Sequence, residues 1–564
     1  MNRPSNCQDR NNEEPGNAQA HPALFISEIT YHLASFVASK SDLVSLALTC
    51  HALSEPALDM LWTDPPSMLP LLLHLPGKPV EVVEDEQDKG VKKTVSLNHA
   101  FTIEDWDAFL KRARRVTWLA QATSHRIDSE YEPEVTYHDI SPNVFRELCS
   151  APTDIIFPRL KQLQWGVPPE YAEHALPFLR MILKPTITDL EIYPFPIAES
   201  DFLMSLEQSL PNLNVFRYRE QEIFAAPGED ITTAKFEAFN ALRSRIIRSW
   251  KRVENLWCGY LDLDALNHLA GLKGFKVARI PLAPSIVSLP FPPGSFPSLQ
   301  ALTTFAPEGQ SLRIFADFLR VVKIPFVNLH LGAGFIEATA FEDLIRVLVD
   351  SEHTDKMEAL RIEELTFHRA DGDGVTMPVM EPLFAFANLR ELFIDVLRVV
   401  RLDDGDILRM AEAWPNLERF SINMRSGWKQ ESSITLRGLR SLVERLPHLF
   451  ELRIAIDASA EVEGLDLGAF ELAPGYAAND DCMLFRLDLL DSKIGDNHNE
   501  VAAYIADIFR GYDLQLEDVP LAWTFGFVPR DLLAECMLYK PGWNHVSNLL
   551  YAATEEAWGK DILD

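Results

Sequence analysis

The residue patterns that mark common active sites are absent from this sequence. No GxSxG, HExxH, GxxxxGK or GxGxxG motif occurs, and the 15 histidines form no close set with Asp or Glu at metal-ligand spacing. The segment DGDG at 371–374 resembles the start of a calcium loop, but it lacks the alternating ligands and the closing Glu, which favours a polar turn. Cys258 stands at a core-facing position of a predicted strand, which indicates a packed thiol. We therefore expect a protein that is not an enzyme and that has no metal or cofactor.

The charge balance excludes two classes of partner. The 83 acidic and 52 basic residues give a formal net charge of −31, which repels the phosphates of nucleic acids and of anionic membranes. No apolar stretch approaches the roughly 18 residues that a membrane span needs, and the N-terminus lacks the apolar core of a signal peptide. The six cysteines lie far apart without a CxxC pair, which fits a reducing compartment. We expect the cytoplasm and/or the nucleus, with no nucleic-acid or membrane partner.

Three short helices are predicted within residues 21–65. The first carries apolar residues at i, i+4, i+7 and i+8 from Ile29, the second follows N-cap candidates Ser41 and Asp42, and the third begins near Pro56 and reaches Trp62. About forty residues cannot bury so many apolar groups alone. These helices must therefore pack against the rest of the chain or against another protein, and the pattern leaves both open.

The segments on either side of these helices carry little apolar periodicity. Residues 1–20 are rich in Asn, Glu, Pro and Gly, which predicts disorder. Residues 66–109 are predicted to be a linker. Its run PVEVVEDEQDKGVKK at 79–93 is first acidic and then basic, which predicts a solvated loop, with charge-mediated docking as the alternative.

A leucine phrase recurs through residues 110–490. It appears as FPRLKQLQW, FPSLQALTT, FANLRELFI and WPNLERFSI, with a modal spacing of 27 residues and a degenerate early copy, RRVTWL. Helical patterns such as AFEDLIRVLVD separate the copies. Each strand-plus-helix unit is too small to close its own core, so the units must stack. We predict an α/β repeat solenoid, with an aromatic-rich cap at 491–564.

The two regions together resemble the F-box/leucine-rich-repeat proteins that are abundant in mushroom-forming fungi. Phe25-Ile26-Ser27-Glu28-Ile29 stands where an F-box opens, with Ile26 in place of the usual Pro. The segments SDLVSLALTC at 41–50 and PALDMLW at 56–62 resemble its later helices. The repeats are similar to the longer leucine-rich repeats. The Asn or Cys that usually follows the strand occurs only sporadically, near Asp395 and Asn423, which predicts an irregular array.

The resemblance implies an adaptor protein. F-box proteins bind Skp1, and through it a cullin, in a ubiquitin ligase, while their repeats hold a protein substrate. The residues implied to mix Skp1 contacts with internal packing are Phe25, Ile29, Leu33, Leu43, Leu46, Leu48, Leu58 and Trp62. The alternative is a repeat scaffold for protein interactions that never joins a ligase.

The residues expected on the open face of the strands form a candidate substrate surface. Side chains alternate along a strand, so the residue after each second leucine anchor should face outward. This column is predicted to be Gln164, Glu191, Arg217, Trp257, Lys276, Thr303, His330, Thr366, Phe393, Ser421, Arg453 and Asp488. We expect Trp257 and Phe393 to anchor a protein or peptide, aided by Lys276, His330 and Arg453, because aromatic side chains are favoured interface anchors. The alternative is that neighbouring loops cover the column.

Overall fold

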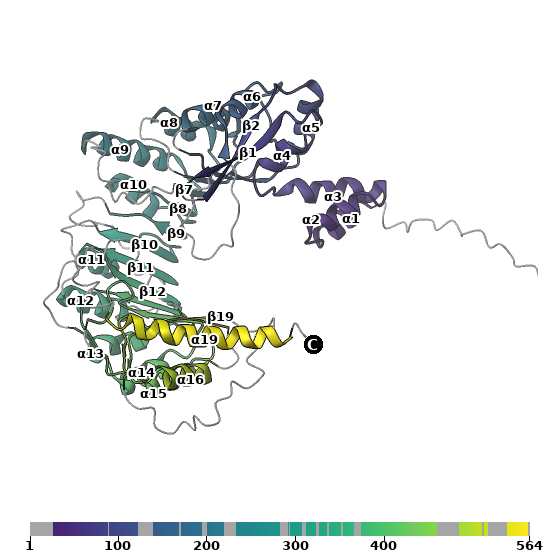
Figure 1. Ribbon diagram of the computed structural model, residues 1–564. Helices are drawn as coiled ribbons and strands as arrows, with labels where there is room; N and C mark the ends of the chain where they lie inside the picture. Colours follow the sequence, from purple (N-terminus) through teal and green to yellow (C-terminus); the bar gives the residue numbers. More distant parts are fainter. Residues whose placement is uncertain are drawn as a thin grey trace, which may run out of the picture. The chain divides into compact units, whose positions relative to one another are not determined.

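A computed structural model gives the arrangement of most of the chain (Figure 1). It describes residues 26–87, 90–121, 139–168, 171–193, 200–218, 233–282, 291–292, 294–306, 312–322, 326–334, 338–350, 354–365, 374–396, 398–429, 431–459, 484–509, 513–516 and 538–561. Contacts divide the chain into two compact units, Met1–Leu210 and Pro211–Asp564, and each is described by itself. The expected disorder at 1–20 and most of the expected polar turn at 371–374 lie outside the described residues.

Three helices open the described part of the first unit: α1 (Ser27–Ser35), α2 (Lys40–Ala47) and α3 (His51–Thr63). They correspond to the three that the sequence predicts, but two begin earlier than expected. The N-cap of α2 is Ser39, whose hydroxyl accepts a hydrogen bond from the Asp42 amide at 3.4 Å. Helix α3 starts at His51, so that Pro56 lies inside it rather than at its first turn.

The loop predicted at 79–93 is wrong, because this segment forms a β-hairpin. Strands β1 (Val80–Gln87) and β2 (Gly90–Leu97) pair antiparallel, and β4 (Asp139–Ile140) pairs parallel with the other side of β2. Val80 and Val95 are buried, whereas Lys93 and Glu84 form a cross-strand ion pair at 2.9 Å. Opposite charges on facing strands are compatible with pairing, which the charge run alone does not reveal. Helices α4 (Leu69–Leu73) and α5 (Ile103–Ala113) flank the hairpin in the sequence.

Parallel strands begin in the second half of the first unit. The strands β3 (Trp118–Gln121), β5 (Gln162–Trp165) and β6 (Asp189–Ile192) pair in this order, and β3 lies in the degenerate phrase RRVTWL. The helices that accompany them are α6 (Pro142–Leu148), α7 (Ala172–Ile182) and α8 (Ser200–Ser209). The strand-plus-helix pattern therefore starts before residue 157, where the first clear copy of the phrase begins.

The second unit repeats the same pattern many times. Its parallel strands pair in sequence order: β7 (Val215–Tyr218), β8 (Asn255–Trp257), β9 (Val277–Arg279), β10 (Ala301–Ala306), β11 (Asn328–Ala333), β12 (Ala359–Glu364), β14 (Glu391–Asp395), β16 (Arg419–Ile422), β17 (Glu451–Arg453), β19 (Leu484–Asp488) and β21 (Asp513–Leu516). The intervening helices are α9 (Thr233–Ser249), α10 (Leu263–Ala270), α11 (Arg313–Val321), α12 (Ala338–Val349), α13 (Met377–Met380), α14 (Asp404–Ala413), α15 (Leu436–Arg445) and α16 (His498–Ile508), with short 3₁₀ turns η3 (Thr354–Lys356) and η4 (Glu381–Ala385). Figure 1 shows α11 and α12 on one side of β10, β11 and β12. This mixed α/β repeat agrees with the predicted fold class.

One apolar side chain from each strand forms the core row of the second unit. The register places these residues side by side: Phe216, Leu256, Ala278, Leu302, Leu329, Leu360, Leu392, Phe420, Leu452 and Leu487. Nearly all of them are buried, and Leu302 is half-buried. The predicted column implies leucine-phrase anchors at Phe275 and Leu365, the residues before Lys276 and Thr366. Both anchors are wrong, because they lie outside the strands and Ala278 and Leu360 take their places.

Two short parallel pairs and a long helix complete the second unit. Strand β13 (Val375–Thr376) pairs with β15 (Val400–Arg401), and β18 (Asp457–Ala458) pairs with β20 (Lys493–Ile494). Helix α19 (Lys540–Asp561) packs against α16, and its buried Trp543 donates a hydrogen bond from Nε1 to the Ser492 carbonyl at 2.9 Å. Strand β21 continues the parallel ladder into the segment 491–564, and the cap expected there stays a prediction. The tail aromatics Trp523, Phe525 and Phe527 lie outside the described residues. No helix among the described residues is long and apolar enough to span a membrane.

Asn423 connects neighbouring repeats through buried hydrogen bonds. Its φ of 56° lies in the left-handed region, which Asn tolerates better than most residues. The side-chain oxygen accepts from the Val396 amide at 2.9 Å, and Nδ2 donates to the Arg398 carbonyl at 2.6 Å. The turn after β14 thereby receives its hydrogen bonds from the repeat that follows it.

We predict that Asn423→Ala lowers the free energy of unfolding by about 2–4 kcal/mol, because two buried backbone groups lose their partner and alanine is strained at positive φ. Urea denaturation followed by circular dichroism measures the change. The exposed Asn416→Ala provides the control and should leave the midpoint unchanged. Equal effects of the two variants would contradict the role assigned to Asn423.

Candidate functional site

The first candidate surface is an apolar face on the N-terminal helices of the first unit. Large apolar side chains that would normally be covered are exposed here: Ile26, Ile29, Leu33, Phe36, Val44 and Leu48. Leu48 is 82% exposed and Phe36 is 73% exposed, both at the ends of helices. Exposed apolar side chains in this number are typical of surfaces that contact another molecule.

The structure separates the predicted adaptor residues by their burial. Ile29, Leu33 and Leu48 lie on the exposed apolar face, whereas Leu43 is 3% exposed and packs internally. Leu46, Leu58 and Trp62 are half-buried, and Phe25 lies outside the described residues.

Trp62 is held by side chains of its own unit. The Arg112 guanidinium lies over its ring at 5.4 Å, and His74 contacts it edge-on with ring centroids 6.3 Å apart. These contacts assign Trp62 to packing within the unit. Sequence reasoning missed Ile26, Phe36 and Val44 as members of the face, although the i, i+7 spacing from Ile29 already marked Phe36.

A buried carboxylate fixes this face to the rest of the first unit. Asp59 in α3 accepts hydrogen bonds from the Tyr31 hydroxyl at 2.8 Å and from the guanidinium of Arg115, and Arg159 lies 3.4 Å away. Arg115 also pairs with Glu55 at 2.6 Å. The network joins α1 and α3 to the segments after α5 and before β5.

The network also changes the acidity of its members. The hydrogen bond that Tyr31 donates to Asp59 raises the pKa of the phenol, and burial acts in the same direction. Burial alone would lower the pKa of Arg115, but its bonds to Glu55 and Asp59 outweigh burial and raise it. The partners are separated by 28 to 100 residues, so no local pattern in the sequence indicates the network.

The second candidate surface is the face row, which consists of the residues next to the core row in the strands of the second unit. The register places one residue per strand side by side: Arg217, Trp257, Arg279, Thr303, His330, Arg361, Phe393, Ser421, Arg453 and Asp488. In the first unit, Gln164 and Glu191 are likewise in register and both contact Tyr193.

Two predicted members of the column are wrong, and the reason is strand register. Lys276 precedes β9, and its ammonium pairs with Glu254 at 2.7 Å, so that Arg279 occupies the row instead. Thr366 follows β12 and lies outside the described residues, and Arg361 occupies the row. The corrected row is therefore richer in arginine than the sequence indicated.

Each predicted aromatic anchor lies against an arginine of the neighbouring strand. The Arg279 guanidinium lies 4.0 Å from the ring centroid of Trp257, and Arg361 lies 5.4 Å from that of Phe393. Cation–π contacts of this kind orient both partners. Trp257 and Phe393 are half-buried, whereas Ser421, Arg453 and Asp488 at the far end of the row are buried. The accessible part of the row therefore lies between β7 and β14.

Arg453 serves the interior rather than the surface. It is 6% exposed, and its guanidinium lies 3.0 Å from Glu451 and 2.8 Å from the Met424 sulfur. Cys258 is also interior, where burial raises the pKa of its thiol to about 12. The thiol is therefore protonated at neutral pH, in agreement with a packed residue. Among the described residues, no group of three or more His, Cys, Asp or Glu side chains could hold a metal ion.

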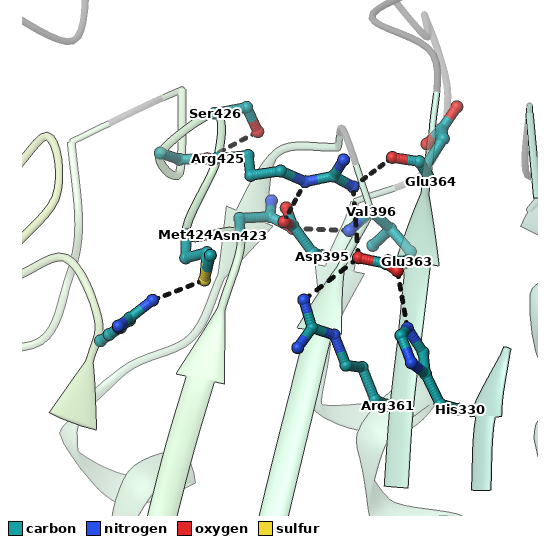
Figure 2. A network of polar contacts seen from close by, with 12 residues as sticks. His330, Arg361, Glu363, Glu364, Asp395, Val396, Asn423, Met424, Arg425 and Ser426 are labelled. Carbon is teal, nitrogen blue, oxygen red and sulfur yellow. Dashed lines mark hydrogen bonds and ion pairs between the residues drawn. The ribbon is translucent and has the colours of Figure 1, made fainter. Parts of the chain in front are cut away.

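A polar network joins the middle of the face row to the strand ends (Figure 2). His330 Nε2 lies 2.6 Å from Glu363 Oε1, and the Arg361 guanidinium lies 3.3 Å from the other oxygen. Arg425 pairs with Asp395 at 2.5 Å and donates to the Glu364 carbonyl. These contacts connect the three neighbouring strands β11, β12 and β14 with the turn after β16.

The network sets the protonation of its two central groups. Burial lowers the pKa of His330, although its bond to Glu363 partly opposes this. Burial would raise the pKa of Glu363, but the hydrogen bond from His330 and the charges of Arg361 and Arg425 lower it overall. A carboxylate only accepts hydrogen bonds, so the neutral imidazole donates from Nε2.

Comparisons with known proteins give a distant likeness among solved structures. No model of a protein family matches this sequence, and no curated protein sequence matches it. Among solved structures, the chain is similar to one in the crystal structure of the Rad7 and Elc1 complex in yeast, with 16% identity, a TM-score of 0.32, and coverage of 56% of this chain and 78% of that one. A likeness this distant carries no argument about function, which must come from the chain's own residues.

We predict that His330→Gln removes part of the pH dependence of stability. The folded-state pKa of His330 lies below its ordinary value of 6.5, so the unfolded chain binds a proton that the folded chain excludes as pH falls through 6.5. Wild-type stability should therefore decline in this window, and the variant should decline less. Thermal unfolding at a series of pH values tests this. Thr303→Val, in register with His330, is the control and should keep the wild-type slope.

Proposed function

We propose that the protein is a non-catalytic substrate receptor of a Skp1–cullin–F-box ubiquitin ligase. The helices of residues 21–65 bind the Skp1-like adaptor, and through it the cullin, while the repeats bind a protein substrate. The observation that carries the proposal is the exposed apolar face of α1 and α2, at the segment that resembles an F-box.

The chemistry of the apolar face supports binding to a helical protein partner. Its members Ile29, Leu33 and Phe36 share one side of α1 by their spacing, and Val44 and Leu48 are exposed on and just after α2. Covering such side chains contributes roughly 25 cal/mol per Å² of apolar area, before the costs of association. The Asp59 network holds α1 and α3 in place without the partner, so less ordering is needed on binding.

The face row supports the second half of the proposal. Between β7 and β14 it offers Trp257 and Phe393, each oriented by an arginine, on a face made of regular strands. Tryptophan and arginine are over-represented among the residues that dominate protein interfaces. We propose that this stretch contacts the substrate, in a protein that resides in the cytoplasm or nucleus and needs no cofactor.

The alternative function is a repeat scaffold whose N-terminal helices never bind an adaptor. The exposed apolar face argues against it, because a helical group that only capped the array would bury those side chains. Capture of Skp1 by the full chain distinguishes the two functions.

We predict that Leu48→Glu, alone or with Leu33→Glu, weakens Skp1 binding by about tenfold or more, because a charge would have to be buried in an apolar contact. Thermal unfolding should not change, since both side chains are exposed. Co-purification and titration calorimetry with the full chain measure the effect.

The control for these variants is Leu73→Glu in α4, an exposed leucine outside the apolar face. It should bind Skp1 like the wild type. A wild-type chain that captures no Skp1 would refute the ligase function, and wild-type affinity in Leu48→Glu would place the contact elsewhere.

We also predict that Trp257→Ala combined with Phe393→Ala reduces capture of substrate proteins and leaves Skp1 binding unchanged. Quantitative mass spectrometry of proteins that co-purify with the full chain measures both. Phe450→Ala is the matched control, because Phe450 also lies against an arginine, with Arg419 5.1 Å from its ring, but precedes β17 outside the face row. Unchanged capture by the double variant would refute the role of the row.

A further inference from the structure

Strand β1 is an open edge of the sheet in the first unit. Among the residues that the structure describes, the sheet order is β1-β2-β4, so β2 is paired on both sides and β1 on one side only. With eight residues, β1 and β2 are longer than the three to six residues of the repeat strands from β7 to β21. An unpaired edge of this length is a template for a further strand unless something covers it.

The register identifies which backbone groups point to the open side. The Asn98 amide donates to the Pro79 carbonyl at 2.8 Å, so these residues form a hydrogen-bonded pair just before Val80↔Leu97. Such pairs alternate along an antiparallel ladder, and the residues between them direct N–H and C=O away from the partner strand. In β1 these residues are Val80, Val82, Glu84 and Glu86.

The outward groups beyond Val80 are open. Val80 is buried and β1 contacts α4, which covers the start of the strand. In the part of the chain that the structure describes, no backbone hydrogen bond outside the pairing with β2 reaches Val82, Glu84 or Glu86. Three successive donor–acceptor sites at alternate residues match the spacing of one added antiparallel or parallel strand.

The charge of β1 selects the kind of strand that fits. Its sequence VEVVEDEQ is acidic, and Glu81 and Glu84 are exposed. On its paired side it already faces a basic strand, since Glu84 lies opposite Lys93 at 2.9 Å. Opposite charges on adjacent strands favour pairing, so a basic strand on the open side would be stabilised in the same way.

We propose that the open edge of β1 binds an extended, lysine- or arginine-rich segment of a protein partner by strand addition. The backbone groups of Val82, Glu84 and Glu86 supply the hydrogen bonds, and the exposed carboxylates of Glu81 and Glu84 select the basic segment. A second copy of this chain does not fit, because β1 against β1 would place acidic residues opposite one another. The surface is distinct from the apolar face and from the face row.

The experiment titrates a synthetic peptide that alternates lysine with valine into the full-length protein at low ionic strength, with fluorescence anisotropy as the readout. Val82→Pro removes one outward N–H and leaves the net charge unchanged, so it should weaken binding by about tenfold or more. Val82→Ala keeps the N–H and should bind within about twofold of the wild type. Hydrogen exchange should show the Val82 and Glu84 amides protected when the peptide is bound.

Peptide variants keep the test independent of folding defects in Val82→Pro. N-methylation of alternate peptide amides should abolish binding to the wild type, and replacement of lysine by glutamate should do the same. Unchanged affinity in Val82→Pro or for the N-methylated peptide would show charge attraction without strand addition and overturn the proposal. The proposal would also be overturned if the free chain dimerises and Val82→Pro abolishes the dimer. The edge would then bind a second copy of this chain.

Discussion

The parallel register of the strands is the constraint on which the rest of the second unit depends. Each strand from β7 to β19 in the long parallel sheet contributes one residue to the core row, and all of these residues except the half-buried Leu302 are buried. Strand pairing therefore has to be in register before the apolar side chains can stack. Because side chains alternate, the same register also aligns the face row on the opposite side of the strands. The core row and the face row are thus both set by the same strand register.

The sequence predicted this architecture because the leucine phrase repeats the core position directly. It failed at two strands, because the fully buried Phe275 and the half-buried Leu365 lie outside the strand. The true members of the core row are Ala278 and Leu360. Since alanine carries little apolar signal, no pattern could have distinguished Ala278. The hairpin was missed because cross-strand charge pairs look like a solvated run. The Asp59 network joins residues too distant in sequence for any local pattern to relate them.

The charge of the corrected face row differs from the net charge of −31 of the whole chain. Arginines replace Lys276 and Thr366 in the row, so basic side chains gather on a surface of a strongly acidic protein. Two of these arginines lie against aromatic rings, and Arg361 also pairs with the buried Glu363. The positive charge of these arginines is thus held in fixed positions. Fixed charges favour a partner in one orientation, and they select between partners more than they raise affinity for any acidic molecule.

The hydrogen bonds of Asn423 make one repeat depend on its neighbour. The turn after β14 depends on a side chain that follows β16, and the Leu383 carbonyl of η4 likewise accepts from Trp414 at the end of α14. In both cases the earlier repeat is completed by the later one. Loss of a repeat at the C-terminal side would therefore leave unsatisfied groups in its predecessor, whereas loss at the N-terminal side would not cost its successor these bonds. The opposite dependence also occurs, because the Thr435 amide donates to the Asp404 carboxylate of the repeat before it at 2.7 Å. Removal of a repeat from inside this stretch should therefore expose unsatisfied polar groups on both of its neighbours.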